Sequence, residues 1–249
     1  MDTAIDPASF TTVRLVSGAL MLWLIIHFRH GSLEGRGNWL SALALFAYAA
    51  GFSFAYVSLP AAVGALLLFG AVQATMIGHG LWLGERIRGL RLAGVLIALG
   101  GLVGLLLPGL SAPPLQGSLL MLGAGVAWGI YSLRGAGTGD ATWKTAGNFI
   151  RTVPITVVLS LLMLKNLSWD QAGFWYAICS GALASGLGYA IWYTVLPALK
   201  TTSAATVQLS VPVIAAAGGI VLLGEPMTVR LLLTSAAILG GIALVVTRN

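Results

Sequence analysis

The sequence predicts an all-α polytopic membrane protein built on an inverted repeat, and three observations support this. Of the 249 residues, 58% are hydrophobic and only 8% are charged, whereas a soluble domain is about 25% charged. Nine apolar runs have the roughly 20 residues that a helix needs to cross a bilayer. The tripeptide Leu83-Gly84-Glu85 returns as Leu223-Gly224-Glu225, so one unit is present twice.

The nine runs are separated by short loops that carry glycine, proline or charge. Because lipid offers no partner to a free backbone group, each run is expected to be a helix. The runs are continuous, unlike the alternating ten-residue strands of a barrel. In order, the predicted spans are 8–27, 38–58, 61–83, 90–108, 115–134, 142–164, 170–194, 201–223 and 228–246.

The distribution of basic residues predicts the orientation. Nine of the 13 lysines and arginines fall on one side if the spans alternate, and two fall on the other. Since basic loops stay in the cytoplasm, we expect a cytoplasmic C-terminus and, with nine spans, an N-terminus on the opposite side. The nine are Arg29, Arg36, Arg86, Arg88, Arg91, Arg134, Lys144, Lys200 and Arg248.

The repeat extends along most of the chain. Arg14 matches Arg151 at an offset of 137, which becomes 140 at the Leu-Gly-Glu units and at two glycine pairs, Gly100-Gly101 and Gly240-Gly241. Equivalent loops then lie on opposite sides of the membrane. The repeat is therefore inverted, as an odd number of helices per half requires.

The two repeats differ by one helix. The first repeat, 1–109, supplies four helices and the second, 115–249, supplies five, because 115–134 has no counterpart. The simplest account is a five-plus-five architecture whose first helix is missing from this chain, which leaves nine transmembrane helices. The alternative is a true nine-helix protein.

Several short motifs resemble a known family. They are Leu-Gly-Glu-Pro at 223–226, Pro-Ala-Leu-Lys-Thr-Thr-Ser-Ala at 197–204, and Asp6-Pro7 before Arg14-Leu15. In order and spacing, over nearly all of the chain, they are similar to the EamA-like family of the drug/metabolite transporter superfamily. The resemblance implies a ten-helix carrier of the inner membrane, in a family that often exports amino acids or other small metabolites.

Arg14 and Arg151 are the first candidates for a binding site. An arginine inside a span costs at least about 2.5 kcal/mol on insertion scales and needs a partner or water. Two at matched positions suit a carboxylate, which arginine binds through two parallel hydrogen bonds. Asn148, three residues before Arg151, shares its helix face. The alternative is that each arginine snorkels to an interface or binds neighbouring carbonyls.

Aromatic residues on two spans are further candidates. Trp128 lies beside Gly125 and Gly129, which permit close helix packing, so it is expected to line a cavity or to join an interfacial aromatic belt. Tyr189 and Tyr193 form a polar stripe with Ser185 at a spacing of four. This stripe is expected to contact a polar substrate or to make hydrogen bonds between helices.

Gln208 and Pro212 suggest a hinge in the span 201–223. A proline removes one backbone hydrogen bond and clashes with the carbonyl four residues earlier, which here belongs to Gln208. A kink beside a polar amide is a candidate binding or hinge point. Gln73 and His79 in the third span are weaker candidates.

The repeated glutamates are interpreted as helix caps. In each copy a glycine suits the left-handed end of one helix, and Glu85 or Glu225 is expected to open the next helix, where an acid complements the positive end of the helix dipole. No aspartate or glutamate lies deep in a span.

These features favour transport over catalysis. The lone Cys179, and the absence of GxxxxGK and HExxH motifs, predict no disulfide framework, no catalytic residues, no metal site and no cofactor. The charge of +6 is dispersed, so nucleic acid is not an expected partner. Two equivalent halves typically rock about a site between them. Together with the family resemblance, which implies export of amino acids or other small metabolites, these features predict a secondary carrier, an exporter of a small polar metabolite such as an amino acid.

Its expected partners are that small-molecule substrate and the lipid bilayer, and a homodimer is left open. The alternative function is that of a non-transporting or degenerate paralogue, or of a partner subunit. Uptake or efflux in vesicles separates the two.

Overall fold

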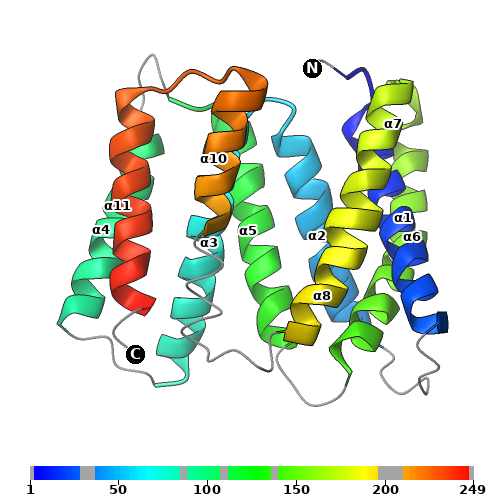
Figure 1. The fold of residues 1–249 in the computed structure, drawn as a ribbon, viewed down its shortest axis with the longest axis horizontal. Coiled ribbons are helices and arrows are strands. Elements are labelled where there is room, and N and C mark those ends of the chain that lie inside the picture. Colours follow the sequence, from blue (N-terminus) through cyan, green and yellow to red (C-terminus); the bar gives the residue numbers. More distant parts are fainter. Residues whose placement is uncertain are drawn as a thin grey trace. The chain divides into compact units, whose positions relative to one another are not determined.

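A computed structural model describes residues 3–28, 37–84, 89–106, 112–135, 140–195 and 210–246. Within these ranges the chain forms helices joined by turns and short extended stretches, without strands (Figure 1). Four helical stretches, Pro7–Phe28, Ala61–Trp82, Thr142–Leu162 and Gln171–Trp192, are long and apolar enough to cross a membrane. The all-α membrane fold predicted from the sequence is confirmed.

Each predicted span corresponds to helix. Boundaries agree to within a few residues, except that 201–209 of the eighth predicted span lies outside the described residues. The helices are α1 (Pro7–Phe28), α2 (Trp39–Ala55), α3 (Ala61–Trp82), α4 (Leu90–Leu106), α5 (Leu115–Gly135), α6 (Ala141–Leu162), α7 (Gln171–Ile178), α8 (Gly188–Val195), α10 (Ser210–Leu223) and α11 (Val229–Val246), with a 3-10 turn, η1 (Leu164–Asn166), after α6.

The span predicted at 170–194 is not a uniform α-helix. Its middle, η2 (Cys179–Leu187), is a π-helix that joins α7 to α8. The Ser185 hydroxyl donates to the carbonyl of Ser180, five residues earlier, at 3.0 Å. Thus Ser185, predicted to face a substrate or another helix, bonds within its own helix at the π-helical turn.

The chain divides into two compact units, and each unit draws helices from both sequence repeats. Unit 1 comprises 1–54 and 130–198, and unit 2 comprises 55–129 and 199–249. Unit 1 therefore contains α1, most of α2, α6, α7 and α8, whereas unit 2 contains α3, α4, most of α5, α10 and α11. The predicted repeats, 1–109 and 115–249, describe duplication in the sequence and not these compact units, and they stay a prediction.

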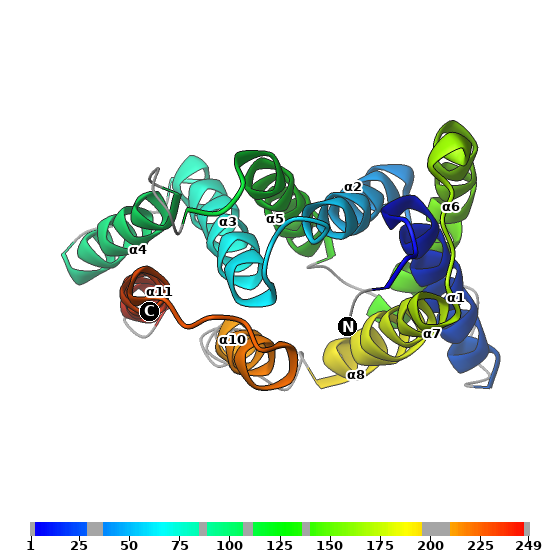
Figure 2. The same cartoon turned by 90° about the horizontal axis from the view of Figure 1, so that it is seen from above.

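Helices that the repeat alignment matches pack against each other. In unit 1, α1 packs on α6 as well as on α7 and η2; in unit 2, α3 packs on α10 and α4 packs on α11. Figure 2 shows α4 and α11 side by side. The offsets of 137 and 140 relate the members of all three matched pairs. Two copies related by a two-fold axis produce such pairing, which supports the inverted repeat.

Candidate functional site

Arg14 lies inside unit 1 and is held by aromatic residues of α2. Its side chain is only 5% exposed. The Nη2 group donates to the Tyr48 hydroxyl at 3.0 Å. The guanidinium carbon lies 5.3 Å from the centre of the Tyr48 ring and 4.7 Å from that of Phe52. A desolvated guanidinium on two aromatic faces is stabilised by cation–π attraction and retains its positive charge.

Local contacts fix the helix that carries Arg14. Asp6 caps α1 by accepting from the backbone N–H groups of Ala8 and Ser9 at 3.0 and 2.9 Å. The Thr12 hydroxyl lies 2.8 Å from that of Ser160 on α6. A Cβ at Gly181 in η2 would collide with the carbonyl oxygen of Arg14. The backbone around Arg14 therefore depends on glycine in the π-helical segment.

Arg151 has a different environment from its repeat partner Arg14. It is half-buried on α6, and its Nη1 group donates to the Gly147 carbonyl one turn earlier at 2.9 Å. This is the carbonyl contact that the sequence left open as the alternative to substrate binding. In these contacts Arg14 bonds Tyr48 and Arg151 bonds Gly147, and a carboxylate site shared by both arginines stays a prediction.

Asn148 joins a polar cluster where α2, α5 and α6 meet in unit 1. Its Oδ1 accepts from the backbone N–H of Asn38 at 2.9 Å, and its amide donates to the Tyr131 hydroxyl at 3.5 Å. Asn38 itself caps α2 by accepting from the Ser41 N–H at 2.8 Å. Arg134 donates to Asn38 at 3.1 Å and to the Ser41 hydroxyl at 3.2 Å. These contacts give Asn148 a structural role in joining the helices.

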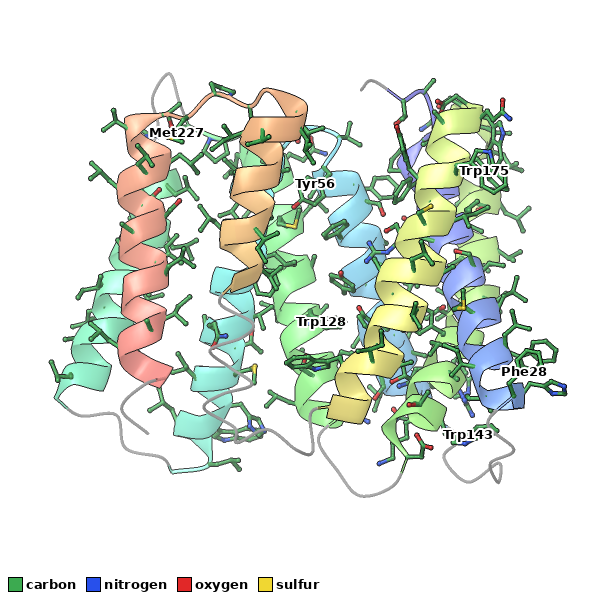
Figure 3. All side chains as sticks on the ribbon, viewed as in Figure 1. Phe28, Tyr56, Trp128, Trp143, Trp175 and Met227 are labelled. Atoms are coloured by element: carbon green, nitrogen blue, oxygen red, sulfur yellow. The ribbon has the colours of Figure 1, made fainter. Side chains whose placement is uncertain are left out.

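The remaining candidate binding residues do not form a single cluster among the described residues. Tyr189 on α8 is half-buried and meets Phe149 edge to face at 5.9 Å. Trp128 is half-buried on α5 and belongs to unit 2, whereas Tyr189 belongs to unit 1. In Figure 3, Trp128 lies away from the end of unit 2 at which Tyr56 and Met227 are labelled. Tyr193 and Pro212 lie in α8 and α10, but their side chains are outside the described residues, as is all of Gln208.

The described acidic residues all serve as helix caps. Asp6, Asp140 and Asp170 accept backbone N–H groups at the starts of α1, α6 and α7. This agrees with the sequence prediction that no acid lies deep in a span. Glu85 is outside the described residues.

Glu225 is a cap as predicted, but of a different helix. Its carboxylate accepts from the N–H groups of Ala61 and Ala62, the second at 3.1 Å, at the start of α3. α11 opens at Val229 instead, where Thr228 accepts from the Leu231 N–H at 3.1 Å. The expectation that Glu225 opens its own next helix is therefore wrong. Pro60 precedes α3 without a side-chain cap, so the N–H groups of the first turn donate to a carboxylate from elsewhere in the chain.

Tyr48 and Phe52 are the site residues that sequence reasoning missed. Their spacing of four residues puts both rings on one face of α2, which is the spacing at which helical side chains are neighbours. The rings lie 5.7 Å apart. The signal available in the sequence was therefore two aromatic residues four positions apart in one span, together with an arginine in the preceding span.

A family model decides the assignment of the chain. The model of the EamA-like transporter family matches residues 115–247, more than half of the chain. The chain belongs to the EamA-like transporter family. It is accordingly a multi-pass membrane protein of a transporter family, as the resemblance noted from its motifs implied.

Two of three relatives of this EamA-like protein match nearly all of its length, and the third matches half of it. It is 57% identical over 98% of its length to an uncharacterized protein of Pseudomonas aeruginosa, of which it covers 85%. It is 23% identical over 96% of its length to the uncharacterized transporter YoaV of Bacillus subtilis, covering 86% of that protein. It is 32% identical to the threonine/homoserine exporter RhtA of Escherichia coli, over 50% of this chain and 43% of that exporter.

A solved crystal structure shares the fold of this EamA-like protein. The TM-score is 0.69 over 97% of this chain and 88% of that chain. Sequence identity is 21%, so the likeness concerns the fold alone.

Proposed function

We propose that this protein is a secondary carrier that exports a small polar metabolite bearing a carboxylate, such as an amino acid, across the inner membrane. The single observation that carries the proposal is the buried Arg14 guanidinium, 3.0 Å from the Tyr48 hydroxyl in a membrane span. Membership of a transporter family supports the carrier function. The orientation, with a cytoplasmic C-terminus, rests on the nine-to-two distribution of basic residues.

The chemistry of the Arg14 site suits a carboxylate. A guanidinium offers a planar fork of donors that matches two carboxylate oxygens, and it stays charged at every physiological pH. The Tyr48 hydroxyl adds a donor beside it, and the Tyr48 and Phe52 rings exclude water. In a low-dielectric span such charge-assisted hydrogen bonds are strong. Rocking of the two repeats then alternates access to the bound substrate.

One named relative supports a particular substrate class within this proposal. The relative RhtA, similar over half of this chain, is a threonine/homoserine exporter. Threonine and homoserine are small amino acids that carry a carboxylate and a hydroxyl. We therefore place small neutral amino acids first among the candidate substrates.

Counterflow in proteoliposomes containing the full chain tests the proposal. Radiolabelled amino acids are exchanged one by one, and the KM of each transported substrate is compared between the wild type and two variants. Arg14→Lys keeps the charge but loses the two-pronged geometry, and Tyr48→Phe keeps the ring but loses the hydroxyl. Both are expected to raise KM, by about tenfold or more for Arg14→Lys, because a charged hydrogen bond contributes about 1.5–3 kcal/mol.

Arg134→Lys provides the control for the arginine exchange, because Arg134 is exposed at the end of α5. It is expected to leave KM unchanged. An unchanged KM in Arg14→Lys would refute the role of Arg14. A chain that exchanges no amino acid or other small carboxylate, in either orientation, would favour the non-transporting paralogue instead.

A further inference from the structure

Unit 2 contains a cavity of about 210 Å³ between α3, α4 and α11. Its walls are almost entirely aliphatic, with Leu81 on α3, Leu102 on α4 and Ile238 on α11 among them. Gln73 on α3 is the one polar side chain among the described residues that line it. This glutamine is only 8% exposed, so its amide lies in apolar surroundings in the middle of a span.

The cavity follows from a row of small residues on α3. Gly70, Ala74 and Gly78 recur at a spacing of four and line the cavity together, as residues on one helix face do. A Cβ placed on Gly78 would meet no atom within 4 Å. The opposite walls cannot close the gap, because α4 and α11 are already in backbone contact at Gly101 and Gly241. Gly78 and Leu81 are exposed, so the cavity opens at the surface of the unit and is accessible to an occupant of this size.

Gln73 indicates the polarity of that occupant. No hydrogen bond to its amide occurs among the described residues. An amide that faces aliphatic walls without a hydrogen-bond partner is unfavourable, and polar groups in folded proteins are normally satisfied. The amide is both a donor and an acceptor. A complementary ligand therefore has one hydrogen-bonding group for the Gln73 amide, and the rest of the ligand is apolar to match the aliphatic walls.

The size and charge of the cavity narrow the ligand class. An engineered cavity of about 150 Å³ lined by Leu, Ile and Phe stays dry and binds benzene, so about 210 Å³ accommodates one substituted ring. The lining residues that the structure describes carry no charge, which disfavours an anion or a cation. We propose that this cavity binds a neutral, mostly apolar molecule of ring size through one hydroxyl or N–H group that bonds Gln73.

This site is independent of the proposed carboxylate site. Arg14 belongs to unit 1, whereas every described residue that lines the cavity belongs to unit 2. The two sites also differ in chemistry, since one offers a cation and the other a neutral amide. Failure of one proposal therefore leaves the other standing.

Binding of 4-fluorophenol and 4-fluorotoluene to the full chain in lipid nanodiscs tests the proposal. The two probes have nearly the same shape, but only the phenol carries a hydroxyl, and fluorine NMR follows each of them. We expect saturable binding of the phenol that weakens about three- to tenfold in Gln73→Leu, which corresponds to the loss of one hydrogen bond. Binding of the toluene is expected to be unchanged or stronger in that variant.

Cavity-filling variants separate binding in the cavity from partitioning into lipid. Gly78→Leu is expected to abolish saturable binding of both probes. Gly123→Leu on α5 is the matched control, because a Cβ there also meets no atom within 4 Å but Gly123 does not line the cavity. Ala74→Val provides a second filling variant, and the thermal unfolding midpoint checks that each variant is folded.

Three outcomes would overturn the proposal. The first is phenol binding that is equal in the wild type and Gly78→Leu. The second is a phenol-to-toluene affinity ratio that Gln73→Leu does not change. The third is a phospholipid that copurifies with the wild type but not with Gly78→Leu, which would assign the cavity to an acyl chain.

Discussion

Gly101 and Gly241 occupy matched positions in the two repeats, and each of them contacts the helix that carries the other. A Cβ on Gly101 of α4 would lie 2.9 Å from the Cβ of Ala237 on α11. A Cβ on Gly241 of α11 would lie 2.6 Å from the backbone nitrogen of Ala98 on α4. The contact is reciprocal, as a two-fold relation between the repeats requires. Because glycine has no side chain, α4 and α11 can approach each other closely in lipid.

Alanine at Gly101 or Gly241 is expected to destabilise the protein. The added methyl group must push α4 and α11 apart, and overpacking of this kind costs about 1–3 kcal/mol. Gly100→Ala and Gly240→Ala are the matched controls, because a Cβ at either position meets no atom within 4 Å. The controls are expected to be neutral or to stabilise the helices by up to about 1 kcal/mol. The measurement is the unfolding free energy in detergent; equal effects at paired and control positions would contradict the reciprocal contact.

Glu225 is expected to stabilise the start of α3. It accepts two N–H groups of the first turn from a loop 164 residues away in sequence from Ala61, and its negative charge complements the positive end of the helix dipole. Glu225→Ala should lower the unfolding free energy by about 0.5–2 kcal/mol, as loss of an N-cap does. Glu225→Gln, which keeps one acceptor oxygen, should lower it less.

A double-mutant cycle with Gly219 tests the same contact independently. A Cβ on Gly219 would lie 2.5 Å from Oε2 of Glu225. Gly219→Ala is therefore expected to displace the carboxylate and to destabilise the wild type more than it destabilises Glu225→Ala. Additive effects of the two substitutions would show that the carboxylate does not occupy this position.

The spans and the repeat could be predicted because their signals are local. A helix that crosses lipid needs a continuous apolar run, and the runs give the starts of α1, α3, α4 and α5 to within one residue. The glycine stops were also readable: Gly84 and Gly224 have φ values of +91° and +67°, a conformation that glycine adopts without steric cost. Arg14 stood out because a charge inside a span is rare.

The partners of these residues could not be predicted because they depend on packing. Nothing in the sequence near Glu225 indicates that its carboxylate reaches α3. The π-helix, in which Gly181 lies close to α1, is likewise not indicated by the residues within the span. Asn148 and Arg151 share a helix face, as predicted, yet the structure gives Asn148 the backbone of Asn38 as its partner.

Asn148 is expected to matter for stability and not for substrate affinity. Asn148→Leu removes the acceptor for the partly buried Asn38 N–H, and an unsatisfied buried donor costs about 1–3 kcal/mol. The unfolding free energy should fall by that amount, while the KM of a transported substrate should stay within about twofold of the wild type. A rise in KM of tenfold or more, with a small change in stability, would instead return Asn148 to the binding site.

Asp6 is expected to make the stability of the protein depend on acid pH. Burial opposes ionisation of its carboxyl group, but hydrogen bonds from Ser9, Ser168 and Ala8 outweigh burial, so the pKa of Asp6 lies below its ordinary value. A pKa that is lower in the folded state than in the unfolded state means that ionised Asp6 favours folding.

The contribution of Asp6 is complete above the ordinary pKa of about 3.9 and is lost as the pH falls through the lower folded value. Asp6→Asn keeps an oxygen that can accept the Ala8 and Ser9 N–H groups, since asparagine is also a good N-cap, but it cannot ionise. The variant should therefore lose less stability than the wild type between pH 6 and pH 3, measured by thermal unfolding in the same detergent. Parallel pH profiles for the two proteins would refute the assignment to Asp6.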